Sequence, residues 1–99
     1  IKLTFGLVYS TSNETIEKVR NEIKTYIVQN KDILPEPCRI HFRKFGDSAL
    51  NFEVVCYTET SDMDEYLKIE NELNLAIKKI IENNDTDFAF PTQTVYVQK

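Results

Sequence analysis

The chain has 99 residues, of which 41% are hydrophobic and 28% charged, and its formal net charge is −4. This length and composition are typical of one globular domain, and the negative charge argues against nonspecific binding to nucleic acid or anionic membranes. No apolar run approaches the roughly 20 residues that cross a bilayer as a helix. Because the chain begins with Ile1 and shows no signal-like segment, we expect a fragment of a longer protein.

Alternating apolar residues over positions 1–9 predict a first strand with its odd-numbered side chains buried. On the opposite face of this strand, Gly6 suggests close approach by another part of the chain. Residues 11–14 (Thr-Ser-Asn-Glu) fit a capping box, and the apolar spacing from Ile16 to Ile27 then predicts a helix with one buried stripe. Prolines within residues 30–37 prevent the helix from continuing.

Two further alternating runs, residues 38–45 and 50–57, flank a turn at Gly46-Asp47-Ser48 and predict a β-hairpin. We expect Phe42 to lie opposite Phe52, with both rings on the core side of the sheet. The same register places His41 opposite Glu53 and Cys38 opposite Cys56.

A second, longer helix is predicted by the apolar spacing from Tyr66 to Ile80, with candidate N-caps in residues 60–64. Asn83-Asn84 can adopt the left-handed conformation that closes a helix. A short apolar strand over residues 88–90 then precedes Pro91, which lacks an N–H donor and fixes a turn.

This order of elements predicts an α+β fold, the ferredoxin-like βαββαβ sandwich, in which two helices cover one face of a four-stranded antiparallel sheet. We expect residues 1–90 to form this domain and residues 91–99 to form a separate C-terminal β tail. The expected core consists of Leu3, Phe5, Leu7, Ile16, Val19, Ile23, Ile40, Phe42, Phe52, Val54, Leu73, Ile77 and Ile80.

Few residues are candidates for chemistry, and no catalytic, cofactor-binding or metal-binding site is predicted. His41, flanked by Arg39 and Arg43, could belong to an anion site, although a solvated or cross-strand-paired row explains the pattern equally simply. The checklist for an active site is not met, so we expect no enzyme. Cys38 and Cys56 have no metal-ligand spacing, and we expect free, buried thiols.

Two binding classes are disfavoured. The acidic residues at the start of the second helix are explained by the helix dipole, and a calcium loop would need a glycine that is missing there. An RNA-recognition domain shares the predicted topology but needs exposed aromatic rings on a basic sheet. We therefore expect no nucleic-acid partner and no cofactor.

The tail, residues 92–97, is rich in Thr, Val and Tyr and is strongly β-prone. No later segment could pair with it, and an unpaired strand is a liability for a folded protein. The simplest expectation is that other copies of the chain supply its partners.

Four stretches resemble the small-conductance mechanosensitive channel (MscS) family. They are Phe45-Gly46-Asp47-Ser48-Ala49-Leu50-Asn51-Phe52-Glu53-Val54, Phe88-Ala89-Phe90-Pro91-Thr92-Gln93-Thr94-Val95, Phe5-Gly6-Leu7-Val8-Tyr9, and Glu72-Leu73-Asn74-Leu75-Ala76-Ile77. The resemblance extends over nearly the whole chain, in the family's order and spacing.

The resemblance implies that the chain is the C-terminal cytoplasmic domain of a channel in the bacterial inner membrane and is itself soluble. In that family seven copies build a cage below the pore, and ions and small solutes leave through it under membrane tension in osmotic downshock. This part would build the cage without gating or conducting. A free-standing ferredoxin-like regulatory domain that binds a small ligand and dimerises through its sheet remains the alternative.

The resemblance further implies that the tails of seven chains close a parallel β-barrel. The expected assembly residues are Pro91, Thr92, Gln93, Thr94, Val95, Tyr96 and Val97. Because strand residues alternate between the inside and outside of a barrel, and because seven Tyr96 rings would not fit around a narrow axis, we expect Gln93, Val95 and Val97 to face the axis.

Overall fold

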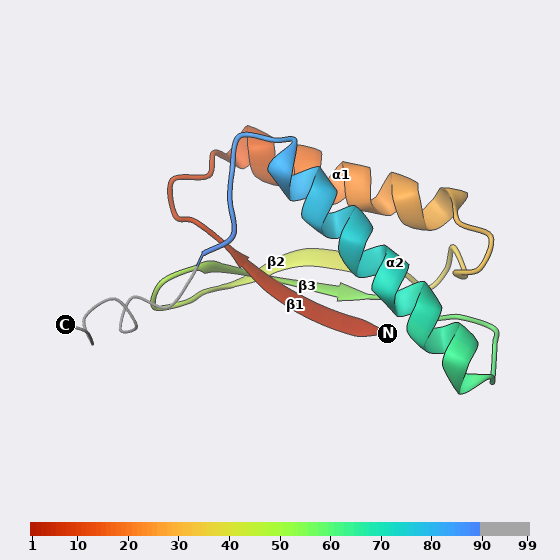
Figure 1. The fold of residues 1–99 in the computed structure, drawn as a ribbon. Helices are drawn as coiled ribbons and strands as arrows, with labels where there is room; N and C mark the ends of the chain where they lie inside the picture. The colour runs from red at the N-terminus through yellow and green to blue at the C-terminus, as the bar shows by residue number, and fades with distance from the viewer. Residues whose placement is uncertain (90–99) are drawn as a thin grey trace.

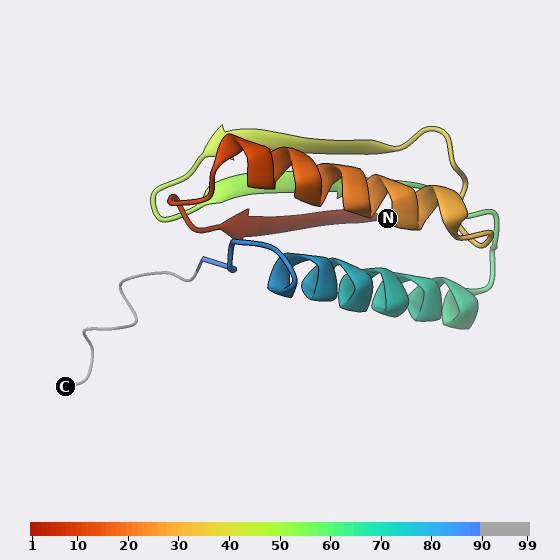
Figure 2. The same cartoon turned by 90° about the horizontal axis from the view of Figure 1, so that it is seen from above.

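The structure, a computed structural model, describes residues 1–89. In chain order it contains β1 (Lys2–Leu7), α1 (Asn13–Gln29), β2 (Arg39–Phe45), β3 (Leu50–Val55) and α2 (Met63–Glu82). The strands form an antiparallel sheet in the order β1-β3-β2. Both helices lie on the same face of the sheet (Figure 1), α1 above β2 and β3 and α2 on the β1 side (Figure 2).

The predicted fourth strand is present in the described residues only as an isolated antiparallel bridge between Leu7 and Phe88. Two backbone hydrogen bonds flank this bridge. The Val8 N–H donates to the Asp87 carbonyl at 3.1 Å, and the Ala89 N–H donates to the Gly6 carbonyl at 3.0 Å. The sheet is therefore three-stranded, with the C-terminal segment beginning to pair along the outer edge of β1.

The predicted register of the hairpin is confirmed. Phe42 pairs with Phe52 and His41 with Glu53. A register shift between Phe42 and Lys44 makes Arg43 the extra residue of a β-bulge. The observed pairing ends at Arg39 and Val55, so the expected pair of Cys38 and Cys56 lies one step beyond it.

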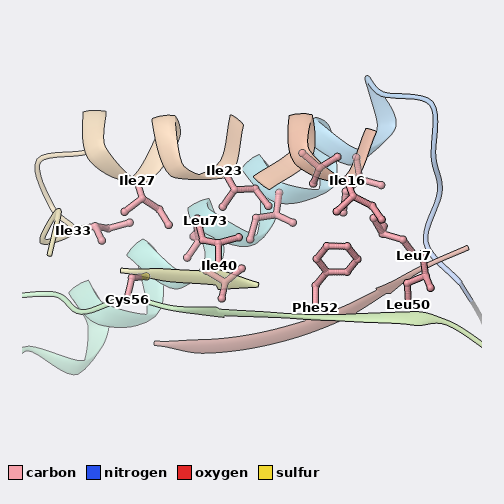
Figure 3. Packing of buried hydrophobic residues seen from close by; sticks show 14 of the residues in the cluster. Leu7, Ile16, Ile23, Ile27, Ile33, Ile40, Leu50, Phe52, Cys56 and Leu73 are labelled. Atoms are coloured by element: carbon pink, nitrogen blue, oxygen red, sulfur yellow. The ribbon is translucent and has the colours of Figure 1, made fainter. Parts of the chain in front are cut away.

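The core lies between the sheet and the two helices (Figure 3), and Phe52 points into it with only 1% of its surface exposed. Most of the predicted core residues are buried, as expected. Leu3, Phe5, Phe42 and Ile80 are only partly buried and pack against the rim of the cluster. Six buried residues were not in the predicted set: Ile27, Ile33, Leu50, Cys56, Ile69 and Ile81.

The N-terminus of α1 differs from the predicted capping box by one residue. The N-cap is Ser12, whose hydroxyl accepts a hydrogen bond from the Thr15 N–H at 3.1 Å. Thr11 is buried instead, because its hydroxyl bonds to the carbonyl of Val8 at 2.6 Å. Ser12, the residue after the predicted cap, therefore supplies the capping hydroxyl.

The predicted left-handed closure of α2 is wrong. Asn83 has φ −89° and ψ 1°. Within the described part, no residue has a positive φ, glycines included. The end of the helix is satisfied by a side chain instead, since the Asn84 amide donates to the Ile80 carbonyl at 2.6 Å. The same amide donates to Glu22 of α1 at 3.2 Å, which joins the two helices.

A row of phenylalanine rings crosses the sheet on its helix-covered face. The Phe42 and Phe52 ring centroids are 5.3 Å apart, and the Phe52 and Phe5 centroids are 5.2 Å apart in a stacked pair. Phe5 then meets Phe88 edge to face at 6.3 Å. The row therefore links all three strands to the C-terminal segment.

Replacing the central ring should be costly. Phe52→Ala should lower the free energy of unfolding by about 3–5 kcal/mol, because a large buried side chain is lost and a cavity remains. Urea denaturation measures the change. The matched control is Phe45→Ala, since Phe45 is 73% exposed and should cost about 1 kcal/mol or less. Equal losses for the two variants would contradict the central position of Phe52.

Candidate functional site

The predicted assembly residues, 91–97, lie outside the described residues, and so do the expected axis-facing positions Gln93, Val95 and Val97. The structure does describe the segment immediately before them. Asp87–Ala89 runs beside Gly6–Val8 at the end of β1, close to the turn between β2 and β3 (Figure 1). We call this region the tail-exit end of the sheet.

Gly6 and the hairpin turn pack against each other without space for a side chain at the tail-exit end. A Cβ atom on Gly6 would lie 2.6 Å from the Cβ of Ala49. Gly46 closes the turn by donating its N–H to the Ala49 carbonyl at 2.8 Å, and a Cβ there would lie 2.5 Å from the amide nitrogen of Asn51. The close approach predicted for Gly6 is thus confirmed, with the side chain of Ala49 as the partner.

The loop between β1 and α1 forms hydrogen bonds to two other parts of the tail-exit end. The Tyr9 hydroxyl donates to the Gly46 carbonyl of the hairpin turn. The Thr11 hydroxyl lies 2.7 Å from that of Thr86, just before the C-terminal segment. Three stretches far apart in sequence therefore meet near the last described residues of the chain.

The second notable feature is the face of the sheet that the helices leave uncovered. Glu53 of β3 forms ion pairs with Lys2 of β1 at 3.4 Å and with Arg43 of β2 at 2.5 Å. One carboxylate thus connects all three strands. The bulge at Arg43 permits the second pair, because it turns an additional basic side chain towards this face.

The electrostatic balance at Glu53 favours its ionised form. Partial burial works to raise its pKa, but the hydrogen bonds and charges of Lys2 and Arg43 outweigh this effect. The pKa of Glu53 is therefore held below the usual glutamate value.

His41 is exposed and lies opposite Glu53 in the sheet. It borders two open surface depressions that also contain Arg20 of α1. Arg20 itself is engaged, because its Nε donates to the Ile40 carbonyl on the free edge of β2 at 3.0 Å and its terminal nitrogen pairs with Glu17 at 2.9 Å. His41 thus lies on a solvent-exposed edge of the sheet, and the guanidinium group of the neighbouring Arg20 is already engaged by other partners.

Both cysteines are free thiols, as predicted, but only Cys56 is buried, and Cys38 is half-buried. Burial is the main cause that raises the pKa of Cys56 and of Cys38, which favours the unreactive protonated form. Within residues 1–89 no group of three or more His, Cys, Asp or Glu side chains could hold a metal ion. None of the described helices is long and apolar enough to cross a membrane.

The aromatic residues that an RNA-recognition domain would expose on its sheet face the core in this structure. Phe42 and Phe52 lie on the helix-covered face with the buried cluster. The uncovered face instead carries alternating polar and charged side chains, so the described sheet lacks the stacking platform that an RNA-recognition domain requires.

Comparison with known proteins assigns these features to a family. Residues 1–88 match the family model described as "Mechanosensitive ion channel MscS, C-terminal". The small-conductance mechanosensitive channel MscMJ of Methanocaldococcus jannaschii is 38% identical over 99 residues, which cover 100% of the chain and 28% of that protein. The low conductance mechanosensitive channel YnaI of Escherichia coli is 34% identical and matches 98% of the chain and 28% of its own length.

A solved structure supports the same assignment. The crystal structure of Helicobacter pylori MscS in a closed state matches with a TM-score of 0.73 and 25% identity, over 100% of this chain and 38% of that one. An MscS family protein of Aquifex aeolicus is 37% identical over the whole chain, which spans 27% of it. The chain therefore spans 27–28% of the length of the three relatives matched by sequence and 38% of the solved structure.

The close packing at Gly6 can be tested with a compensating pair. Gly6→Ala should lower the free energy of unfolding by about 1–3 kcal/mol through overpacking against Ala49. Adding Ala49→Gly should recover part of this loss, because it removes the methyl group that the new side chain meets. Denaturant unfolding of the two single variants and the double variant gives the coupling. Strictly additive losses would contradict the contact.

The Glu53 ion pairs predict a dependence of stability on pH. A carboxyl group with a lowered folded-state pKa stabilises the fold above its unfolded pKa, about 4.3 for glutamate, and loses that contribution as the pH falls through the folded value. Glu53→Gln should therefore flatten the acid side of the stability curve measured by urea unfolding. The control is Glu72→Gln, at an exposed position of α2, which should leave the curve unchanged. Identical curves for wild type and Glu53→Gln would refute the assignment.

Proposed function

The chain belongs to the MscS family of mechanosensitive channels, and we propose that it forms part of the cytoplasmic cage below the pore of such a channel. The complete channel would release ions and small solutes across the bacterial inner membrane when tension rises in osmotic downshock. This part would shape the cage without itself gating or conducting. The observation that carries the proposal is the family match over residues 1–88 together with 34–38% identity to channels along almost the whole chain.

We propose that the C-terminal segment completes a four-stranded, ferredoxin-like sheet and ends it at Phe90. In β1 the residues that bond to this segment are even-numbered, since Val8 donates to Asp87 and Gly6 accepts from Ala89. Continued antiparallel pairing would bring residue 91 opposite Thr4, where its N–H would have to donate to the Thr4 carbonyl. Pro91 has no N–H, so this hydrogen bond cannot form.

We therefore propose that the chain divides into a body, residues 1–90, and an assembly strand, residues 91–99. The bridge at Leu7 and Phe88 anchors the body's last residues to β1, while the proline releases the following strand from its own sheet. Seven such strands would pair with one another in a closed barrel, which leaves no unpaired edge. Gln93, Val95 and Val97 would face its axis, and Thr92, Thr94 and Tyr96 would face outward.

The alternative, a free-standing domain that binds a small ligand, would need a pocket with converging polar groups. The depressions on the described surface are open, and the one along the outer side of α1 is lined by polar and charged residues such as the exposed Glu14 and Lys18. The cage module is therefore the better supported function.

The function is tested in the full-length protein that carries this chain, expressed in bacteria that lack their own mechanosensitive channels. We expect it to restore survival after osmotic downshock and to give currents that open under suction in membrane patches. A full-length protein that reaches the inner membrane but shows neither property would contradict the proposal.

The proposed orientation of the tail predicts opposite effects for two substitutions to tryptophan. In the full-length protein, Val95→Trp should prevent closure of the barrel, because seven indole rings at one level exceed the space around a narrow axis. Tyr96→Trp should be tolerated, because its ring would point outward. Subunit number and thermal stability of the purified assembly report the difference. Tolerance of Val95→Trp combined with disruption by Tyr96→Trp would show that the faces are inverted.

A further inference from the structure

The face of the sheet opposite the helices carries a cluster of positive charge in this otherwise acidic chain. We call it the basic face and define it by Lys2, Arg39, Arg43, Lys44 and Glu53. Four positive residues and one negative residue give it a formal charge of +3, whereas the whole chain has −4. Neither helix covers this face (Figure 1).

The basic face keeps unused charge after its internal ion pairs are counted. Glu53 is shared by Lys2 and Arg43. Arg39 and Lys44 are exposed, and in the part of the chain that the structure describes neither forms a salt bridge. The face therefore presents two cations at its β2 side in addition to the partly neutralised group around Glu53.

A complementary surface lies at the N-terminal end of α2. Glu59, Asp62, Asp64 and Glu65 are all exposed there, and no lysine or arginine occurs between residues 59 and 67. The helix dipole accounts for acids in a first turn, but these four charges also form the most acidic stretch of the described surface. The end of α2 projects beyond the sheet (Figures 1 and 2), which makes it accessible to a neighbouring molecule.

We propose that the basic face of one copy of the chain docks against the acidic N-terminal end of α2 on the next copy. The proposal rests on the multi-copy cage proposed above and names the contact between its bodies. Two copies cannot join basic face to basic face, because charges of the same sign would then oppose each other. Charge repulsion therefore disfavours a two-fold contact through the two sheet faces, whereas a head-to-tail contact brings opposite charges together.

The type of contact has a structural consequence. A head-to-tail interface uses two different surfaces of each copy and closes into a ring when the rotation between copies permits. A two-fold interface would instead stop at a dimer joined through the sheets, as the ligand-binding alternative requires. The charge distribution of the body thus disfavours the sheet-to-sheet dimer and is compatible with a ring, independently of the tail.

The test exchanges charges in the full-length protein. The sheet variant carries Arg39→Glu and Lys44→Glu, the helix variant carries Asp64→Lys and Glu65→Lys, and the combined variant carries all four. A control variant with Lys18→Glu and Lys31→Glu makes the same charge change as the sheet variant at exposed sites outside both surfaces. Arg39→Gln with Lys44→Gln provides a milder sheet variant in case the reversal impairs folding. The half-life of the purified assembly at low salt is measured by light scattering after chromatography.

We expect each reversal alone to shorten the half-life at least about tenfold, because like charges then face each other. The combined variant should return to within about threefold of wild type, and the control variant should remain there. The loss should fade in 1 M salt, where the Debye length is about 3 Å.

Three results would overturn the proposal. The first is that neither the sheet variant nor the helix variant shortens the half-life of the assembly. The second is that the combined variant dissociates as fast as either of them. Binding of wild type to vesicles of anionic lipid that the sheet variant loses, with an unchanged half-life, would assign the basic face to a lipid surface instead. If the charge variants leave the half-life unchanged while the wild-type channel still opens under tension, the proposed contact is refuted and the cage function is not. If the wild-type protein forms no multi-subunit assembly, both the contact and the cage function are refuted.

Discussion

The stacking of Phe52 between Phe42 and Phe5 is the interaction on which the rest of the structure depends. It joins the three strands across the face that the helices cover, with ring centroids 5.2–5.3 Å apart. Phe5 extends the row to Phe88, so the same packing that forms the core also positions the segment from which the tail continues. The same ring packing therefore stabilises the core and holds the last described segment against β1.

Much of the fold could be predicted because period-two and helical spacing are local properties of the sequence. Alternation and the position of the turn allowed a consistent hairpin register, and Phe42 and Phe52 pair as expected. Other features depend on tertiary contacts. Ile33 lies in a loop without periodicity and is buried by a bridge to Thr58. Ile81 rather than Ile80 is fully buried, because spacings of three and four both continue a helical stripe.

The candidate site was only partly accessible to sequence reasoning. The motifs around Gly6, Gly46 and Phe88 pointed to the family, but not to their convergence at the tail-exit end. Alternation placed Glu53 opposite His41, yet its partners are Lys2 and Arg43. That choice depends on which strand neighbours β3 and on a bulge, and neither has a clear local signal. The basic face likewise emerges only when three separate strands are brought side by side.

We infer that identical copies of this body form a ring with the basic face of each copy turned towards its neighbour. Electron cryo-microscopy of the full-length assembly tests this most directly. The account predicts seven bodies around one axis, each basic face against the α2 end of the next copy, and the assembly strands closed into a barrel at the tail-exit end. A dimer joined through its two sheet faces, or a ring in which the basic faces contact no neighbouring body, would contradict it.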